Sequence, residues 1–147
     1  MSYPTEIDFA VVKIGDGASP ETFPVVCGIQ NAAVNQTVQT SDQQKIDCAK
    51  PGKKPTRTVR VTGSQWDVTG SGVTSVEQFP ALQAALGKRR NIQIVALRDD
   101  GTDEGEELGT FEGQGVLTAL NINMQRDSGT MEVTIAGEND LTWTPAA

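Results

Sequence analysis

Along much of this chain, apolar and polar residues alternate with a period of two, which is the pattern of a half-buried β-strand. The alternation is clearest across Thr56–Thr62 and Thr130–Ala136. No regular exchange of strand and helix patterns occurs, so a parallel α/β sheet is not expected. The pattern predicts a mainly β protein, an antiparallel β-sandwich or barrel with roughly seven strands for one helix. Further strand-like runs are expected at Ile7–Ile14, Phe23–Ile29, Ala33–Gln39, Gln65–Thr69 and Asn91–Leu97, and from Leu108–Phe111 through Gly113 and Gly115 into Val116–Met124.

One helix is expected at about 75–87, flanking the sheet. Its apolar residues recur at steps of three and four and form one stripe. Ser75 with Gln78 resembles a capping box, Pro80 falls near the first turn, and Gly87 suits the helix end. The stripe consists of Val76, Phe79, Leu82, Ala85 and Leu86.

A long polar excursion separates the early strands from the helix. From Thr37 to Gly72, a strand-like run enters a basic loop rich in Pro and Gly and returns as a second strand-like run. Almost no apolar residue lies at the tip of this excursion, so it is poorly suited to building a core. The sequence predicts an extended hairpin arm at about 37–62 that contacts something outside its own subunit.

Composition fits a single domain over residues 1–147, including the arm and the helix. No run of 18 apolar residues occurs, so no membrane-spanning segment is expected. The N-terminal residues MSYPTEID lack a basic region followed by an apolar one, so no secretory signal is expected either. Cys27 and Cys48 are too few for a disulfide framework, and we expect two buried or half-buried thiols.

Charge is unevenly distributed around a net value of −7. Six of the twelve basic residues lie in the arm, and six acidic residues lie in one expected turn. These could be two solvated loops, or complementary surfaces that attract each other between neighbouring subunits. In the second case the arm residues that make the contact are Lys45, Lys50, Lys53, Lys54 and Arg57. Arg60 is the sixth basic residue of the arm. Their acidic partners are Asp99, Asp100, Asp103, Glu104, Glu106 and Glu107.

Residues for catalysis are missing. The chain has no histidine, which removes the commonest general base and metal ligand. No phosphate-binding GxxxxGK[ST] loop occurs, and the acidic run DDGTDEGEE departs from a calcium-binding EF-hand loop in its glycine positions. Trp66 and Trp143 are better explained as core or rim residues than as a ligand platform. We therefore expect no enzyme, no catalytic residue, no metal and no cofactor.

The order of several short motifs resembles one known family. The chain is similar to the major tail tube proteins of long-tailed, non-contractile bacteriophages, typified by lactococcal siphophage tubes and related gene transfer agents. The motifs cover nearly the full length. They are Cys27-Gly28-Ile29, Asn31-Ala32, Asp47-Cys48-Ala49-Lys50-Pro51-Gly52, Thr62-Gly63-Ser64-Gln65-Trp66, Gly70-Ser71-Gly72, Leu86-Gly87, Gly101-Thr102-Asp103, Ala136-Gly137-Glu138-Asn139-Asp140 and Trp143.

This resemblance implies a structural protein of the virion tail, present in the host cytoplasm during assembly. Six copies would close into a ring through sheet edges, and stacked rings would form a hollow tube whose lumen conducts the viral genome into the host. The arm would contact the adjoining ring. Implied partners are further copies of the chain, a tape measure protein in the lumen, tail terminator and tail tip proteins, and DNA in transit without specific binding.

Two other classes remain open at this stage. One is the tube protein of a secretion system with the same architecture. The other is a monomeric β-sandwich binding module, which would need an aromatic binding face, and the chain has only seven aromatic residues. The sequence also leaves open which strand faces line the lumen.

Overall fold

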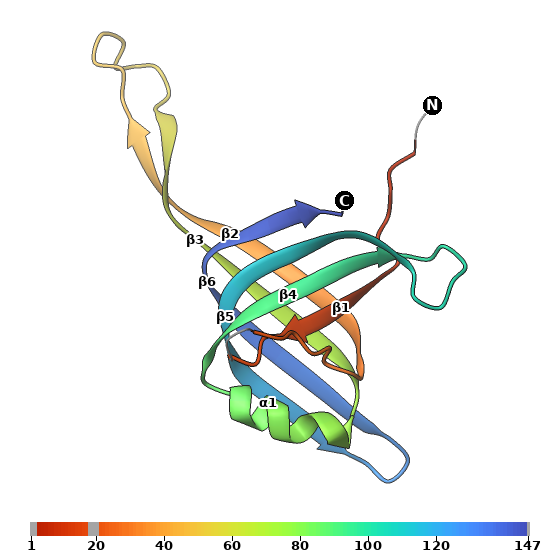
Figure 1. Cartoon of the computed structure of the whole chain (residues 1–147). Coiled ribbons are helices and arrows are strands. Elements are labelled where there is room, and N and C mark those ends of the chain that lie inside the picture. Colours follow the sequence, from red (N-terminus) through yellow and green to blue (C-terminus); the bar gives the residue numbers. More distant parts are fainter. Residues whose placement is uncertain (1–2, 18–20, 147) are drawn as a thin grey trace. The chain divides into compact units, whose positions relative to one another are not determined.

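A computed structural model describes residues 3–17 and 21–146. The chain forms two compact units, which we describe separately. The body comprises residues 1–35 and 66–147, and the second unit, residues 36–65, contains the arm. Six antiparallel strands form one sheet in the order β1-β4-β5-β6-β3-β2 (Figure 1). The strands are β1 Phe9–Ile14, β2 Ile29–Lys45, β3 Thr56–Val73, β4 Arg89–Arg98, β5 Glu106–Met124 and β6 Gly129–Pro145. A mainly β antiparallel fold with one short helix confirms the expected fold class.

The body is one sheet that curls around its own core. Side chains from β1 and β4, including Val12 and Ile92, pack against Val68 and Val133 from β3 and β6 in one apolar cluster. The cluster is closed by Leu82 and Ala85 of the helix α1 (Phe79–Ala85). Alternate residues along each strand enter this cluster, as the period-two pattern requires. The curled sheet therefore has two layers, with β5 and β6 long enough to belong to both (Figure 1).

The expected helix is shorter than its apolar stripe. A 3-10 turn, η1 (Val76–Gln78), precedes α1, and Pro80 lies in the first turn of α1, where its missing N–H costs no hydrogen bond. The expected capping box does not form, because the Ser75 hydroxyl donates to Glu77 rather than to the backbone. Gly87 adopts a φ of 80°, the left-handed conformation expected at a helix end.

Three expectations about local structure were wrong. Phe23–Ile29 forms only an isolated bridge at Val25, opposite Lys13 of β1, and the strand begins at Ile29. Thr56–Thr62 and Gln65–Thr69, expected as separate runs, belong to the single strand β3, whereas Leu108–Phe111 leads into Val116–Met124 within β5 as expected. Cys27 and Cys48 are free thiols but are exposed rather than buried.

The second unit is a two-stranded hairpin built from the ends of β2 and β3. The side-chain amide of Gln39 donates to Gln65 Oε1 at 3.2 Å, and Arg57 Nη1 forms an ion pair with Asp42 Oδ2 at 3.7 Å. All its residues are exposed except Thr58 and Gly63, so the hairpin has no core of its own. Among the described residues no helix is both long and apolar enough to cross a membrane.

Candidate functional site

Two sheet edges of the body are left open in the same layer. Pairing of β4 with β5 ends at Arg89 and Val116, and an isolated bridge follows at Leu117. Residues 118–124 of β5 are therefore paired with β6 on one side only. At the other end of the layer, β3 is the only strand that pairs with β2 in the described part of the chain, so residues 29–35 also form an open edge. We call these the β5 edge and the β2 edge.

Neither edge has the usual protection against pairing with another chain. Proteins commonly guard open strands with charged residues or proline, because unpaired N–H and C=O groups invite a further strand. The β5 edge reads TALNINM and the β2 edge reads IQNAAVN, with no charged residue and no proline in either. Two unprotected edges of equal length at opposite ends of one layer are suited to pairing with each other in separate copies.

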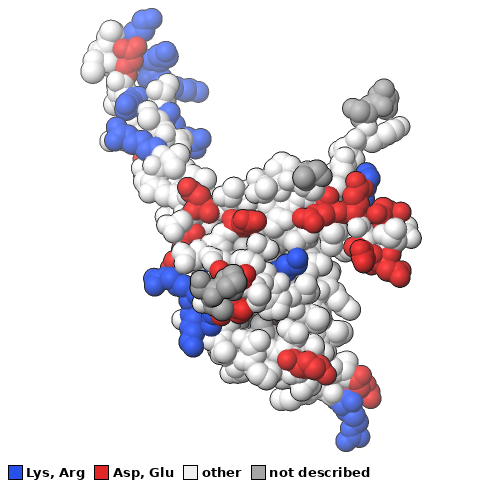
Figure 2. Space-filling view, viewed as in Figure 1, with Lys and Arg blue, Asp and Glu red and all other residues white. Residues whose placement is uncertain are grey.

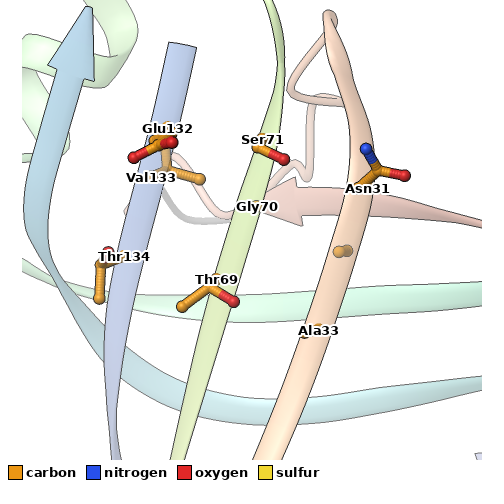
Figure 3. A pocket seen from close by; sticks show the side chains of 9 residues that line it. Asn31, Ala33, Thr69, Gly70, Ser71, Glu132, Val133 and Thr134 are labelled. Atoms are coloured by element: carbon orange, nitrogen blue, oxygen red, sulfur yellow. The ribbon is translucent and has the colours of Figure 1, made fainter.

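The face of this layer that points away from the core is polar and hollowed. A hollow of about 370 Å³ lies across β2, β3 and β6, where small side chains such as Ala33 and Ser71 leave space (Figure 3). The layer consists of residues 29–35 of β2, 66–73 of β3, 129–136 of β6 and 118–124 of β5. These four segments contain no Lys or Arg, and Asp67 and Glu132 are their only charged residues. Hydroxyl, amide and carboxylate groups therefore cover this face. The hollow is lined by Asn31, Ala32, Ala33, Thr69, Gly70, Ser71, Glu132, Val133 and Thr134.

The arm carries most of its charge as exposed cations. Figure 2 shows the blue Lys and Arg side chains gathered along this hairpin. With six basic and two acidic residues the second unit has a net charge of +4, whereas the remaining six basic and 17 acidic residues give the body −11. The five predicted contact residues are all exposed, and of these Arg57 has an ion pair, with Asp42, within the second unit.

The six predicted acidic residues lie together in the loop after β4 and in the first two residues of β5, and we call this segment (residues 99–107) the acidic loop. Figure 2 shows red Asp and Glu side chains gathered on one side of the body, with uncharged atoms between them. Several of these carboxylates have partners nearby: Asp99 accepts from the N–H of Gly101 at 3.0 Å, and Glu106 pairs with Arg98 at the end of β4. Asp100 accepts hydrogen bonds from the hydroxyl and from the N–H of Thr102. Both hold the pKa of the Asp100 carboxyl below its usual value, and the hydroxyl has the larger effect.

Beside the other end of β4, Arg89 donates through Nε to Glu138 at 2.7 Å, and this hydrogen bond raises the pKa of Arg89. Among the described residues, no group of His, Cys, Asp and Glu is arranged to hold a metal ion. Sequence reasoning found the arm and the acidic loop but missed the two edges. Their signal was available in the uncharged runs at 29–35 and 118–124, but only strand pairing shows that these runs lack a partner.

Comparisons with solved structures identify the fold. The chain superposes on a subunit of the tail of an empty gene transfer agent particle, refined with C6 symmetry, with a TM-score of 0.64, 15% identity and coverage of 91% of this chain and 94% of that one. The SPP1 tail tube gives a TM-score of 0.65 at 8% identity, covering 97% and 80%. The sheath-tube complex of the extracellular contractile injection system PVC gives 0.64 at 14% identity, covering 99% and 95%.

No family model and no curated protein matches the chain by sequence. At identities this low, the structural similarity establishes the fold alone. The chain has the tail-tube fold, shared by tubes of phages, gene transfer agents and injection systems.

Proposed function

We propose that this chain is a non-enzymatic tube subunit, whose copies join edge to edge into rings that stack into a hollow tube. The observation that carries the proposal is the pair of open, uncharged edges at opposite ends of one layer. A strand edge of this kind aggregates unless something covers it. A contact between two different edges repeats from copy to copy, and closes when the rotation between copies completes a circle.

Strand direction supports this joint. Within the layer β2 and β3 run in opposite directions, as do β3 and β6, and β6 and β5 (Figure 1). With four strands in the layer, the β5 edge of one copy meets the β2 edge of the next in antiparallel order. The apolar layer also continues across the joint, since Leu120 and Ala32 are half-buried at the two edges and pack against the core. Pairing would complete their burial.

The number of copies in the ring is proposed from the comparison. The gene transfer agent tail that shares the fold has C6 symmetry. Six copies of a four-stranded layer would enclose a lumen lined by one continuous sheet. We propose that the polar face around Thr69 and Glu132 lines this lumen, because its lack of cations would let nucleic acid pass without adhering.

The arm is proposed to join successive rings. A body of net charge −11 attracts a hairpin of net charge +4 from another copy, and such complementarity sets the orientation and rate of association. Lys45, Lys50, Lys53, Lys54 and Arg57 are its proposed contacts. The acidic loop, with Asp99, Asp100, Asp103, Glu104, Glu106 and Glu107, is the proposed attracting surface on the adjoining ring.

In this role the protein is the major tail tube subunit of a long-tailed phage or gene transfer agent, assembled in the host cytoplasm and carried in the virion tail. The lumen would hold a tape measure protein during assembly and later conduct the genome into the host. Terminator and tip proteins would bind the two tube ends. The tube of an injection system is the second candidate, since the PVC sheath-tube complex matches with a similar TM-score.

Negative-stain electron microscopy of the purified chain, combined with native mass spectrometry, tests the tube. We expect rings with a central hole, a six-subunit mass and stacked tubes at higher concentration. A monomer that persists at high concentration would refute the proposal and favour a monomeric binding module. Neighbouring genes then separate the two candidates, because tape measure and terminase genes accompany a phage tail.

A further inference from the structure

A second hollow lies in the other layer of the curled sheet, across β4, β5 and β6 on the face away from the core, and we call it the outer groove. It has a volume of about 500 Å³. It exists because pairing skips from Glu112–Thr142 to Gln114–Glu138, so that three residues of β6 bulge opposite Gly113. Within the bulge Asn139 takes a φ of 57°, which is uncommon for a residue with a side chain. The groove is lined by Phe23, Asn91, Ile92, Gln93, Glu112, Gly113, Gln114, Asp140 and Thr142.

Two carboxylates in this groove lack a cation. Glu112 and Asp140 are exposed, and neither has an ion pair or hydrogen bond within the described part of the chain. Nearby carboxylates are engaged: Glu138 binds Arg89, and Glu21 accepts from the Asn91 amide at 2.6 Å. The remaining lining is amide, hydroxyl and apolar, so the groove presents uncompensated negative charge to anything that enters it.

The tip of the arm presents the complementary charge on an ordered turn. The N–H of Lys50 donates to the Asp47 carbonyl at 3.1 Å, and the N–H of Lys53 donates to the Lys50 carbonyl at 3.0 Å. Asp47 also accepts from the N–H of Ala49 through its side chain at 3.0 Å. Two consecutive turns therefore order the backbone that carries Lys50 and Lys53. Both side chains are exposed, and neither has an ion pair in the described residues.

From these observations we infer that the outer groove is the seat of the arm tip of another copy, with Lys50 and Lys53 facing Glu112 and Asp140. This inference rests on the proposed stacking of rings. Two unpaired cations on an ordered turn meet two unpaired carboxylates in a hollow. In the acidic loop, by contrast, four of the six carboxylates already accept hydrogen bonds from neighbouring groups, and only Asp103 and Glu104 have no such partner in the described residues. The acidic loop attracts the arm over distance, and the groove fixes where its tip comes to rest.

Disulfide trapping tests the seat directly, because Cys48 lies in the arm tip and is exposed. In a Cys27→Ser background, Thr142→Cys places a thiol in the groove, and Asp103→Cys places a matched thiol on the acidic loop. Mild oxidation of assembled tubes should give covalent dimers and longer ladders with Thr142→Cys, at a yield at least about tenfold above Asp103→Cys, since disulfides need Cα atoms within about 7 Å. Equal yields, or a higher yield from Asp103→Cys, would overturn the groove as the seat.

Charge exchange gives a second, independent test. Glu112→Lys with Asp140→Lys should raise the concentration needed for tubes by about tenfold or more, because like charges oppose across the contact. Adding Lys50→Glu and Lys53→Glu to the same chain should restore assembly. Native mass spectrometry reports rings separately: normal tubes from the groove variant overturn the seat alone, whereas wild-type protein that never forms rings overturns the proposed function and the seat together.

Discussion

The indole ring of Trp66 lies directly on Gly137, where a β-carbon would overlap its ring atoms Cε2 and Cδ2. The same ring covers Gly113, at which a β-carbon would stand 2.5 Å from Cζ2, and its Nε1 donates to the Glu138 carbonyl at 3.3 Å. Trp66 thereby joins β3 to β5 and β6 at the point where β6 begins its bulge. Both glycines are required by the volume of one side chain.

Gly137→Ala should therefore destabilise the body by about 1–3 kcal/mol, the usual cost of forcing extra volume into a packed core. The measurement is urea denaturation followed by the fluorescence of Trp66. Gly52→Ala at the arm tip is the control, because a β-carbon at that position would meet no atom within 4 Å and the φ of Gly52 is not in the left-handed region. Equal stability of the two variants would contradict the packing argument.

A charge on the β5 edge should block ring formation without unfolding the monomer. Asn121→Lys places a lysine opposite Glu132 of β6, an acceptable neighbour within the sheet, but leaves an ammonium group where the next copy must pair. We expect the protein concentration at which rings form to be about tenfold higher, or more, for this variant than for the wild-type chain. Thr134→Lys adds the same charge to the same face on a central strand and should still form rings, as native mass spectrometry would show.

The period-two pattern predicted most strands of the body because one side of each enters the core. The same pattern at Thr56–Thr62 predicted a strand correctly but not its burial, since Val59 and Val61 are exposed in the second unit. The pattern could not show why glycine is needed at position 113 of β5, since the Trp66 ring that covers Gly113 comes from 47 positions earlier in the chain. The apolar stripe and the Ser75–Gln78 capping pattern likewise predicted a helix from about residue 75, whereas α1 begins at Phe79, with Pro80 in its first turn and no side-chain cap before it. Neighbouring residues therefore determine where strands and helices form, and contacts with residues distant in the sequence determine where they begin and end.

The candidate surfaces divide in the same way. Charge clusters such as Lys53 and Lys54 are visible in the sequence because their members are neighbours along the chain. The two edges and the outer groove depend on pairing: the β5 edge exists because β4 ends at Arg89, and the groove exists because Asn139 bulges. Neither the end of β4 nor the bulge of β6 can be predicted from any one segment of the sequence.

Reversing two charges in the arm should impair stacking while the monomer stays folded. Lys53→Glu with Lys54→Glu lowers the net charge of the second unit from +4 to 0 and should yield rings or short tubes in negative stain. Wild-type tubes should also shorten as salt rises, since the screening length falls from about 10 Å at 0.1 M to about 3 Å at 1 M. Tubes of normal length from the double variant would remove the arm from the assembly mechanism.

Acid should loosen the acidic loop through Asp100. Its folded pKa lies below the ordinary value, so the carboxylate supports the loop above the unfolded pKa, and this support is lost as pH falls through the folded pKa. Thr102→Val removes the hydroxyl donor and should raise the pKa of Asp100 toward 3.8, measured by NMR titration of the carboxyl carbon. Thr130→Val on β6 should leave that pKa unchanged, and a similar shift in both variants would exclude the hydrogen bond as its cause.

A cation in the proposed lumen should make the tube retain DNA. The four segments of the lumen layer contain no Lys or Arg, so Glu132→Lys would supply the first basic residue of each subunit on that face. Binding of short labelled duplex DNA to assembled tubes should rise at least about tenfold at low salt and fall again with added salt, because phosphate contacts release counterions. Glu77→Lys makes the same charge change on η1, outside the layer, and should bind less. Equal binding by both variants would place Glu132 outside the path of the DNA.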